Sequence, residues 1–314
     1  MSIKQKLTGD QLKESSLKPL SVLEGIYGPF YLDNGSKSGK SYAKKTGLFK
    51  YSKYFEKELR ILLRFHKNPF IVRSSSHHVH FETNEKGESL CSIYMEFASL
   101  GNLNKMISDA GGALPEAIVM RATRMILQGL KALHSEGYVH CDLKPTNVLF
   151  FPSTTPGQPW DLKLTGFGLS KEPTMDSRLY YPGTLQYMPR EATESFRFVE
   201  DDLLTGPARD TWALGRTVLE MFGATPIIER GNSYKWRLYG DISPVATDFL
   251  RRCLTMRPGD RATVDELLDH PFVAEKLPFY LCFLRLPSLV RKIAKELLYG
   301  KHEELTPIPD GLDW

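Results

Sequence analysis

Cysteine is scarce in this chain and is never closely spaced. The 314 residues include four cysteines, with no Cys-x-x-Cys pair: Cys91, Cys141, Cys253 and Cys282. Small disulfide-stabilised proteins use cysteine more densely, and disulfides persist in oxidising compartments. The cysteine content therefore favours a protein of a reducing intracellular compartment.

Long apolar segments and a leader-like start are also missing. The first residues, MSIKQKLTGD, contain no apolar stretch, and the longest apolar run, LPFYLCFL at 277–284, includes a proline. A bilayer-spanning helix needs about 20 apolar residues. We therefore expect no signal peptide and no membrane span, and a cytoplasmic protein, with the nucleus as an alternative.

Neither sign of charge dominates. There are 41 Lys and Arg against 37 Asp and Glu, for a net charge of +4. Nucleic-acid-binding domains usually concentrate basic residues on one face, so no nucleic-acid partner is expected. With 41% hydrophobic residues, the chain can bury a sizeable core in one large domain or two medium lobes.

The pattern changes from strands to helices along the chain. Residues 19–98 are strand-rich: strands are predicted on both sides of an Asn34-Gly35 turn, at 70–83 (FIVRSSSHHVHFET) and at 89–97, and one helix at 52–65. Helices are predicted at 115–137, which begins at Pro115 and stops at Gly137, then after Asp210 and at 262–269.

Two short motifs suggest ligands but are explained more simply. GSKSGKS (35–41) resembles a Walker A loop, yet only three residues separate its first glycine from Gly39-Lys40, where four are needed, so a flexible turn is favoured. His77, His78 and His80 could bind a metal, but no carboxylate or cysteine is close in sequence, which favours exposed histidines.

The stretch VHCDLKPTNVLF (139–150) carries the most specific chemistry. A carboxylate (Asp142), an ammonium (Lys144) and an amide (Asn147) can orient a hydroxyl, meet phosphoryl charge and bind a metal, respectively. The stretch resembles the catalytic loop of eukaryotic protein kinases, with Asp142 and Asn147 at the required spacing. The resemblance implies that Asp142 accepts the substrate hydroxyl proton, Lys144 contacts the transferred phosphate and Asn147 holds Mg²⁺.

Segments earlier in the chain resemble the same family. In KSYAKKT (40–46), Lys45 matches the strand lysine that binds ATP phosphates, and Glu58 matches its helix partner. Ala43 and Lys45 share one strand face, so Lys44 is expected to point the other way. In IYMEFASLGNL (93–103), the resemblance makes Met95 the gatekeeper. It also implies that the backbones of Glu96 and Ala98 bind adenine.

Later segments continue the resemblance in the family's order. Asp210, in DTWALG, matches the buried residue that anchors the catalytic loop. Thr184 matches the threonine that braces Asp142 and Lys144, and Arg261 is the expected partner of Glu191. The matches extend over residues 19–273, and the chain is identified as a member of the eukaryotic protein kinase family, serine/threonine type. The phrase DTWALGRTVLEMFGATP is most similar to plant kinases of the MAP-kinase-kinase-kinase type.

Two departures concern the phosphate loop and the catalytic loop. LEGIYGPF (23–30) keeps Gly25 and Gly28 as phosphate-loop glycines but has Leu23 in place of the first glycine. Cys141 replaces the arginine that receives a phosphorylated residue, and a thiol cannot form that charged pair. Phosphorylation of Thr174 or Ser177 is therefore not expected to activate the chain by this route. Cys141 itself is expected to be a buried small apolar residue.

The largest departure is in DLKLTGFGLS (161–170), where Gly166 replaces the family's metal-binding aspartate. Neither Thr165 nor Asp161 is placed to substitute for it. Disturbing even an outer partner of a metal ligand costs roughly 10–100-fold, so we expect a weakened Mg²⁺ site on Asn147. Restoring an aspartate at position 166 is expected to raise the transfer rate. Phe167 is retained, and the resemblance gives it a hydrophobic role.

These observations predict an α+β, two-lobed protein kinase fold. The expected parts are an N-terminal extension (1–18), a kinase domain (19–273, with a β-rich lobe at 19–97 and a helical lobe at 98–273) and a C-terminal extension (274–314). The expected ligands are ATP and weakly bound Mg²⁺, and the partner is a protein substrate or a signalling protein. Two functions remain open: a weakened serine/threonine kinase, and a pseudokinase scaffold that regulates a partner.

Overall fold

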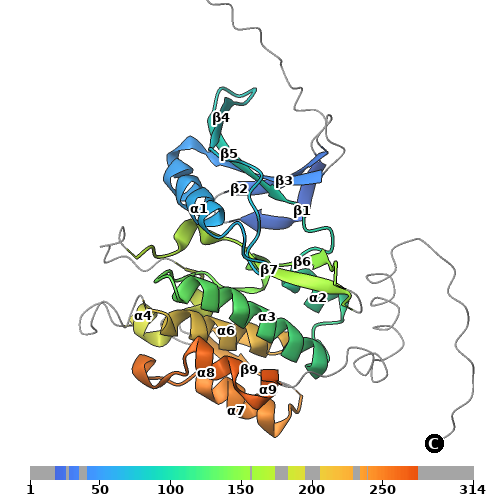
Figure 1. Ribbon diagram of the computed structural model, residues 1–314, viewed down its shortest axis with the longest axis vertical. Helices are drawn as coiled ribbons and strands as arrows, with labels where there is room; N and C mark the ends of the chain where they lie inside the picture. Colours follow the sequence, from blue (N-terminus) through green and yellow to red (C-terminus); the bar gives the residue numbers. More distant parts are fainter. Residues whose placement is uncertain are drawn as a thin grey trace, which may run out of the picture. The chain divides into compact units, whose positions relative to one another are not determined.

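The computed structural model describes residues 18–25, 28–34, 41–155, 158–173, 183–194, 206–228, 234–238 and 240–274. The predicted turn at 35–40, the residues 174 and 177, and the two terminal extensions lie outside these ranges. The chain divides into two compact units: a strand-rich unit of residues up to His66 and from Val72 to Phe97, and a second unit of Lys67–Ile71 and residues from Ala98 onward (Figure 1). The predicted mixed α+β architecture is confirmed.

The first unit is built on a five-stranded antiparallel sheet in the order β1-β2-β3-β5-β4. The strands are β1 (Lys18–Gly25), β2 (Gly28–Asn34), β3 (Ser41–Leu48), β4 (His80–Thr83) and β5 (Ser89–Glu96). Helix α1 (Ser52–Arg64) lies beside this sheet. The helical spacing of four apolar residues predicts a buried stripe of Phe55, Leu59, Leu62 and Leu63; the first three are buried, and Leu63 is half-buried.

The strand predicted over 70–83 is wrong for most of its length, since only His80–Thr83 is a strand. The serines explain the difference. The Ser74 hydroxyl accepts a hydrogen bond from Ser76 N–H, and the N–H groups of Ser75 and Ser76 both donate to Tyr94 O. Side-chain bonds of this kind offer the backbone an alternative to a regular ladder.

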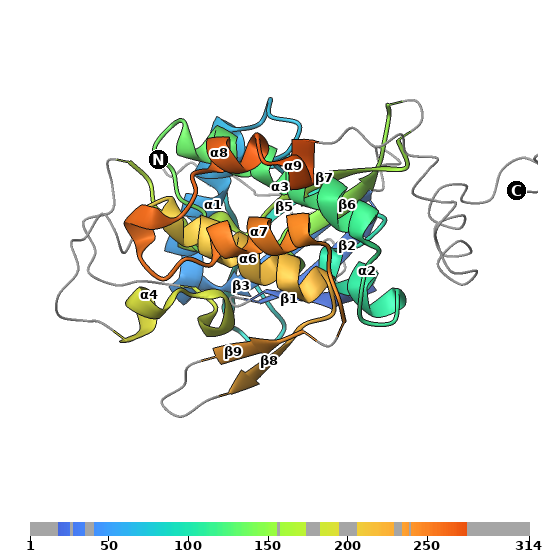
Figure 2. The same ribbon diagram turned by 90° about the horizontal axis from the view of Figure 1, so that it is seen from below.

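The second unit is mainly helical. Its helices are α2 (Leu103–Asp109), α3 (Glu116–His134), α4 (Arg190–Glu194), α6 (Ala208–Met221), α7 (Pro244–Cys253), α8 (Val264–Leu268) and α9 (Pro271–Ala274) (Figure 2). Two hairpins accompany them, β6 (Val148–Pro152) with β7 (Trp160–Leu164), and β8 (Thr225–Ile228) with β9 (Tyr234–Arg237). The second hairpin was not predicted.

Helix α3 follows the sequence prediction closely. It starts directly after Pro115 and is followed by Gly137, whose φ of 77° is easy for glycine alone. Its predicted apolar stripe is buried except for Ile118, which is half-buried. Gly129 is approached by Leu164 of β7 and by the Phe70 carbonyl, and a Cβ on it would lie 2.7 Å from Leu164 Cδ1. The close approach packs α3 against the hairpin that directly follows Asn147 in the sequence.

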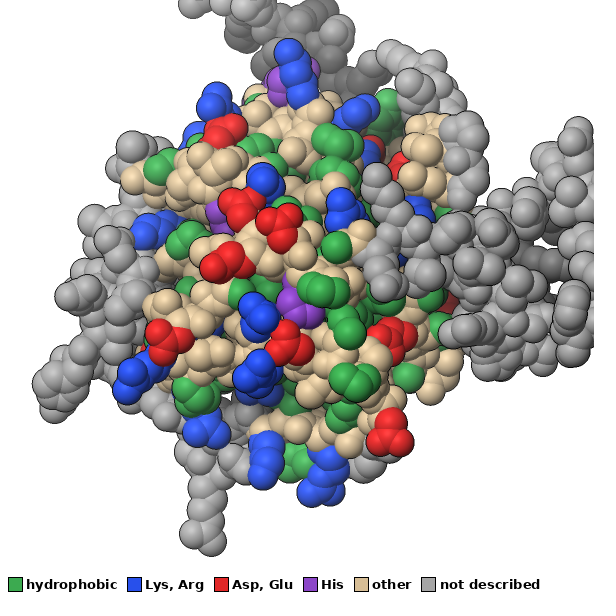
Figure 3. Space-filling model, turned by 60° about the horizontal axis from the view of Figure 1, so that its bottom comes forward, with side chains coloured by type: hydrophobic (Ala, Val, Ile, Leu, Met, Phe, Trp, Pro, Cys, Tyr) green, Lys and Arg blue, Asp and Glu red, His purple; other side chains and the backbone are tan. Residues whose placement is uncertain are grey.

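Helix α6 starts earlier than predicted, so Asp210 lies in its first turn and not before it. Acidic and basic side chains intermingle on the face of the molecule shown in Figure 3. No helix in the described ranges combines the length and the hydropathy needed to cross a bilayer.

Candidate active site

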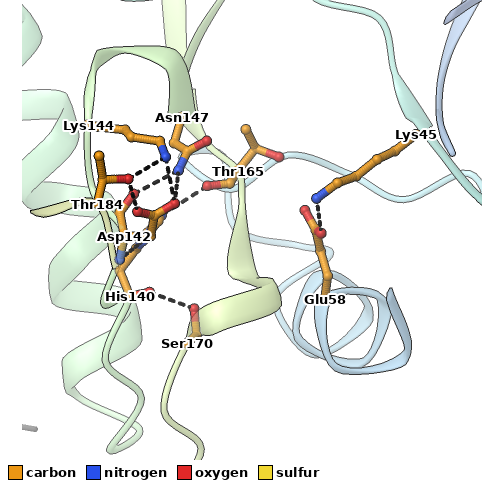
Figure 4. Close-up of polar contacts among 9 residues, drawn as sticks. All are labelled: Lys45, Glu58, His140, Asp142, Lys144, Asn147, Thr165, Ser170 and Thr184. Atoms are coloured by element: carbon orange, nitrogen blue, oxygen red, sulfur yellow. Dashed lines mark hydrogen bonds and ion pairs between the residues drawn. The ribbon is translucent and has the colours of Figure 1, made fainter. Parts of the chain in front are cut away.

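Asp142 is the centre of a polar cluster in the second unit (Figure 4). Its Oδ1 accepts a hydrogen bond of 2.7 Å from Thr184 Oγ1, and its Oδ2 lies 2.9 Å from Lys144 Nζ. Lys144 Nζ in turn donates to Thr184 Oγ1 at 2.6 Å. Thr184 therefore lies where the resemblance implies: it bridges the carboxylate and the ammonium group and holds both in one arrangement.

Asp210 anchors the loop that precedes Asp142. Its carboxylate is fully buried and accepts hydrogen bonds from the backbone N–H groups of His140 (2.7 Å) and Cys141 (2.9 Å). His134 Nε2, at the end of α3, lies 2.8 Å from Asp210 Oδ2. Burial alone would raise the pKa of Asp210, but the His134 hydrogen bond and the neighbouring imidazoles outweigh it and lower the pKa. Asp210 is thus buried beneath the catalytic loop and bonded to its backbone, as the resemblance implies.

Cys141 adopts a backbone conformation that the sequence does not predict. Its φ of 64° is the only positive value among the described non-glycine residues. The left-handed region costs a non-glycine residue roughly 1–2 kcal/mol, so the Asp210 hydrogen bond to its N–H must hold it there. Its thiol is buried, as predicted for a small apolar residue in place of the family's arginine.

His140 connects the catalytic loop to the Gly166 segment. The Asp142 N–H donates to His140 Nδ1 (3.2 Å), so Nδ1 is the unprotonated nitrogen and Nε2 donates to Thr165 O (2.9 Å). Ser170 Oγ also donates to the His140 carbonyl at 2.9 Å. The ring of Phe167 is fully buried with its centroid 5.0 Å from that of His140. The imidazole is thus held in one orientation by contacts on both ring nitrogens and on one face.

Asn147 lies beside Gly166 because of the β6–β7 ladder. Val148 pairs with Leu164 in that ladder, and Thr165 N–H donates to Asn147 O at 3.0 Å. Asn147 Nδ2 donates to Asp142 O (2.7 Å) and to Asp142 Oδ2 (3.1 Å). Gly166 has φ 86° and ψ 37°, and a Cβ on it would lie 2.6–2.7 Å from all three atoms of the Asn147 carboxamide.

Glu191 and Arg261, the expected partners, lie in contact as a bidentate pair. Arg261 Nη1 and Nη2 lie 2.6 and 2.9 Å from the two Glu191 oxygens, and the guanidinium side chain is fully buried. Arg261 also donates to the carbonyls of Thr255 and Met256. The pair ties the segment after Thr184 to the chain beyond α7.

In the first unit, Lys45 and Glu58 meet. Lys45 Nζ lies 2.5 Å from Glu58 Oε2, and both side chains are buried (Figure 4). Glu58 Oε1 is buried without a hydrogen-bond partner in the part of the chain that the structure describes. Lys44 points to the other face and pairs with Glu82 at 2.6 Å, as the strand alternation predicts. The sequence suggests the Lys45–Glu58 pair, and the structure shows that the two side chains meet.

The other predicted nucleotide contacts are distributed over both units. Gly25 and Gly28 pair with each other where β1 ends and β2 begins. Met95 is buried and opposes Ala43 across the β3–β5 ladder. Glu96 N–H donates to Arg73 O at 3.0 Å, so that donor is already used. In the second unit, Ala98 O accepts from Gly101 N–H and keeps one lone pair for a ligand.

Among the residues that the structure describes, few side chains near Asp142 are available to a divalent cation. Mg²⁺ is bound in proteins by one or two carboxylates together with phosphate oxygens and waters. Asp142 is the carboxylate at hand, and its oxygens already accept bonds from Thr184, Lys144 and Asn147. Within the described ranges no three His, Cys, Asp or Glu side chains are grouped as a metal site would require, the His77–His80 segment included.

Two positioning residues were not predicted. His134 and His140 both lie in the LHSEGYVHCD stretch (133–142), and each contacts an anchoring group of the catalytic loop. The only signal in the sequence was a histidine two residues before Asp142 and another directly before the helix end. Their partners, Asp210 and Thr165, are distant in sequence, so spacing could not identify them.

A β-sheet unit with a buried Lys–Glu pair and a helical unit with an Asp–Lys–Asn catalytic loop together define the protein kinase class. Residues 24–273 match the protein kinase domain. The chain belongs to the protein kinase family, with serine/threonine kinases as its relatives.

Three plant relatives illustrate the similarity. The chain is 32% identical over 260 residues to Mitogen-activated protein kinase kinase kinase 18 of Arabidopsis thaliana, which covers 77% of this chain and 72% of that protein. It is 31% identical over 286 residues to Mitogen-activated protein kinase kinase 7 of the same plant, covering 85% and 87%. It is 31% identical over 271 residues to Mitogen-activated protein kinase kinase kinase 5, covering 81% of this chain but 36% of that protein.

The resemblance to plant MAP-kinase-kinase-kinase-type kinases is thus confirmed at the level of the family. Protein kinases in general use ATP and Mg²⁺ and act on protein substrates.

Proposed function

We propose that the chain binds ATP and transfers its γ-phosphoryl group to a serine or threonine hydroxyl of a protein substrate, at a rate reduced by the absence of a carboxylate at 166. The observation that carries the proposal is the preorganised cluster of Asp142, Lys144 and Thr184, whose contacts lie within hydrogen-bond distance. Preorganised charges of this kind supply most of the catalysis in phosphoryl transfer.

Each residue of the cluster has a distinct role in this proposal. Asp142 Oδ accepts the proton of the substrate hydroxyl, and Lys144 Nζ neutralises the charge that develops on the transferred group. Thr184 keeps the two side chains in register, since it donates to Asp142 and accepts from Lys144. Lys45, held by Glu58, contacts the nucleotide phosphates.

The proposed metal dependence is weak. Asn147 directs its N–H atoms to Asp142, and Gly166 has no side-chain oxygen. ATP binding followed by thermal shift is therefore expected to change little when Mg²⁺ is added. A strong Mg²⁺-dependent stabilisation would contradict the proposed loss of a main ligand at 166.

The decisive experiment is radiolabel transfer from γ-labelled ATP to a generic protein substrate by the purified full chain. Asp142→Asn removes the proton acceptor and is expected to lower the rate by about 10²–10⁴-fold, the usual contribution of a general base. Asp241→Asn, the same exchange at an exposed position, is the matched control. Transfer that persists at the control rate in Asp142→Asn would show that Asp142 is not the base.

A second function, a pseudokinase scaffold, is favoured by one observation, the glycine at 166. In that case the wild type binds ATP, or folds stably without it, and shows no transfer that depends on Asp142. The same assay separates the two functions. For location, we propose the cytoplasm, with the nucleus as the alternative, to be tested by imaging a fluorescently tagged chain.

A further inference from the structure

Three side chains of helix α6 form a stripe on one face of the helix. They are Trp212, Arg216 and Glu220, which are spaced by four residues and therefore lie one above the other. The guanidinium carbon of Arg216 lies 4.9 Å from the centroid of the Trp212 ring. The stripe thus presents an aromatic, a cationic and an acidic group in a row to whatever packs on this face of α6.

Trp236, in the strand β9, packs on the middle of this stripe. The guanidinium carbon of Arg216 lies 5.7 Å from the centroid of the Trp236 ring, so Arg216 contacts two indole rings. The neighbours Lys235 and Arg237 are exposed, as is Pro226, which pairs with Trp236 in the ladder. Successive side chains of a strand point to opposite faces, and Trp236 is on the face that meets the helix. Trp236 therefore joins the β8–β9 hairpin to α6.

The ring of Trp236 also contacts Tyr187, in the segment that follows Thr184. The two ring centroids lie 6.0 Å apart with an angle of 54° between the ring planes. Tyr187 is buried, and its hydroxyl donates to Glu220 Oε2 at 2.5 Å. Burial and the neighbouring Glu220 raise the pKa of Tyr187, so the hydroxyl keeps the proton that it donates. One aromatic ring is thus held between α6 and β9.

The position of Tyr187 determines the backbone at Thr184. Tyr187 is the buried residue of the short 3₁₀ turn Leu185–Tyr187, and its N–H donates to the Thr184 carbonyl at 2.9 Å. The Thr184 hydroxyl bridges Asp142 and Lys144, as described above. A displacement of the Tyr187 ring would therefore reach the catalytic cluster through a single turn of backbone.

We infer that Trp236 is a positioning residue for the catalytic cluster: its ring holds Tyr187 against α6, and Tyr187 holds the backbone of Thr184. The functional meaning of this inference rests on the proposed phosphoryl transfer, but the link from Trp236 to Thr184 can be tested without any nucleotide.

Ring packing, and not a hydrogen bond, keeps Trp236 in place. Its indole Nε1 is buried and has no hydrogen-bond partner in the part of the chain that the structure describes. A buried N–H group without a partner lowers stability, so the indole nitrogen contributes nothing that favours this position. A phenylalanine, which has a ring but no N–H, is therefore expected to take over the role of Trp236, whereas an alanine is not.

The first test is hydrogen exchange of the backbone amides of residues 184–188, measured by mass spectrometry on the full chain without nucleotide. Trp236→Ala should raise the exchange rate by about 2–10-fold, the factor that corresponds to the loss of one aromatic pair. Trp236→Phe should exchange at nearly the rate of the wild type.

The matched control is Trp160→Ala, which removes a buried tryptophan of the other hairpin, where it packs on Phe150. It lowers stability but is expected to leave exchange at residues 184–188 unchanged. The inference is overturned if Trp236→Ala raises this exchange no more than Trp160→Ala does, or if Trp236→Phe exchanges as fast as Trp236→Ala. Should Trp236→Ala fail to fold, Trp236→Leu, which keeps an apolar side chain but no ring, replaces it under the same outcomes.

The second test separates positioning from a purely structural role. In the radiolabel transfer assay, Trp236→Ala should lower kcat by about 10–10²-fold, because a small misplacement of catalytic groups has effects of this size. The KM for ATP should not change, and Trp236→Phe should restore kcat. An unchanged kcat, or a loss confined to the KM for ATP, would contradict the inference. If the wild type transfers no label, the proposed function fails, and the exchange experiment still decides whether Trp236 holds Thr184.

Discussion

Asp210→Ala is expected to loosen the catalytic loop by removing its buried anchor. The substitution leaves two buried backbone N–H groups, of His140 and Cys141, without their acceptor. Each unsatisfied group costs about 1–3 kcal/mol, so the free energy of unfolding should fall by about 2–6 kcal/mol. Cys141 also loses the bond that holds its φ of 64°, and its left-handed conformation should relax.

Thermal unfolding checks this prediction directly. In a domain of this size about 1 kcal/mol corresponds to 2–4 °C, so the unfolding temperature should fall by at least about 4 °C. The control is Asp265→Ala, which removes an exposed carboxylate paired with Lys131, and exposed pairs contribute about 0–1 kcal/mol. The reasoning is refuted if Asp210→Ala unfolds at the same temperature as Asp265→Ala.

Three further predictions follow from the geometry. The pKa of Asp210 is lowered, despite burial, by its hydrogen bonds, so its stabilising effect is present above the unfolded pKa of about 3.9 and is lost as the pH falls below it. Acid unfolding of Asp210→Asn, followed by circular dichroism, should accordingly depend less on pH in that range. Lys45→Met leaves the carboxylate of Glu58 buried and unpaired, which should cost about 3–5 kcal/mol in chemical denaturation, and Lys45→Met with Glu58→Leu should recover most of it; a double variant no more stable than the single one would contradict this. Arg261→Lys keeps the charge but loses the bidentate geometry with Glu191, and calorimetry should show a loss of more than about 1 kcal/mol.

The elements that the sequence predicted well are those with strong local signals. Helix α3 has a proline before it, a glycine after it and a continuous apolar stripe, and all three agree with each other. The prediction of a strand over 70–83 was wrong because serine hydroxyls bond to the local backbone. The alternation of apolar residues carries no information about such bonds. The hairpin β8–β9 was missed because its strands are four residues each, too short for a periodic pattern.

The candidate site likewise contains residues that the sequence could identify from local spacing and residues that it could not. Residues of the catalytic loop could be found from spacing, because 142, 144 and 147 lie within six residues of each other. Their partners could be named only through the resemblance, since Thr184, Asp210 and Arg261 reach their contacts across 40 to 70 residues. The positive φ of Cys141 could not be foreseen, because cysteine has no preference for that region and tertiary hydrogen bonds impose it.

The hydrogen bond from Thr165 N–H to Asn147 O makes positions 147 and 166 neighbours whatever side chains they carry. The two positions therefore share one packing environment, and residues in contact couple energetically. The effect of a substitution at either position is expected to depend on the residue at the other, so the two should be varied together and not one at a time.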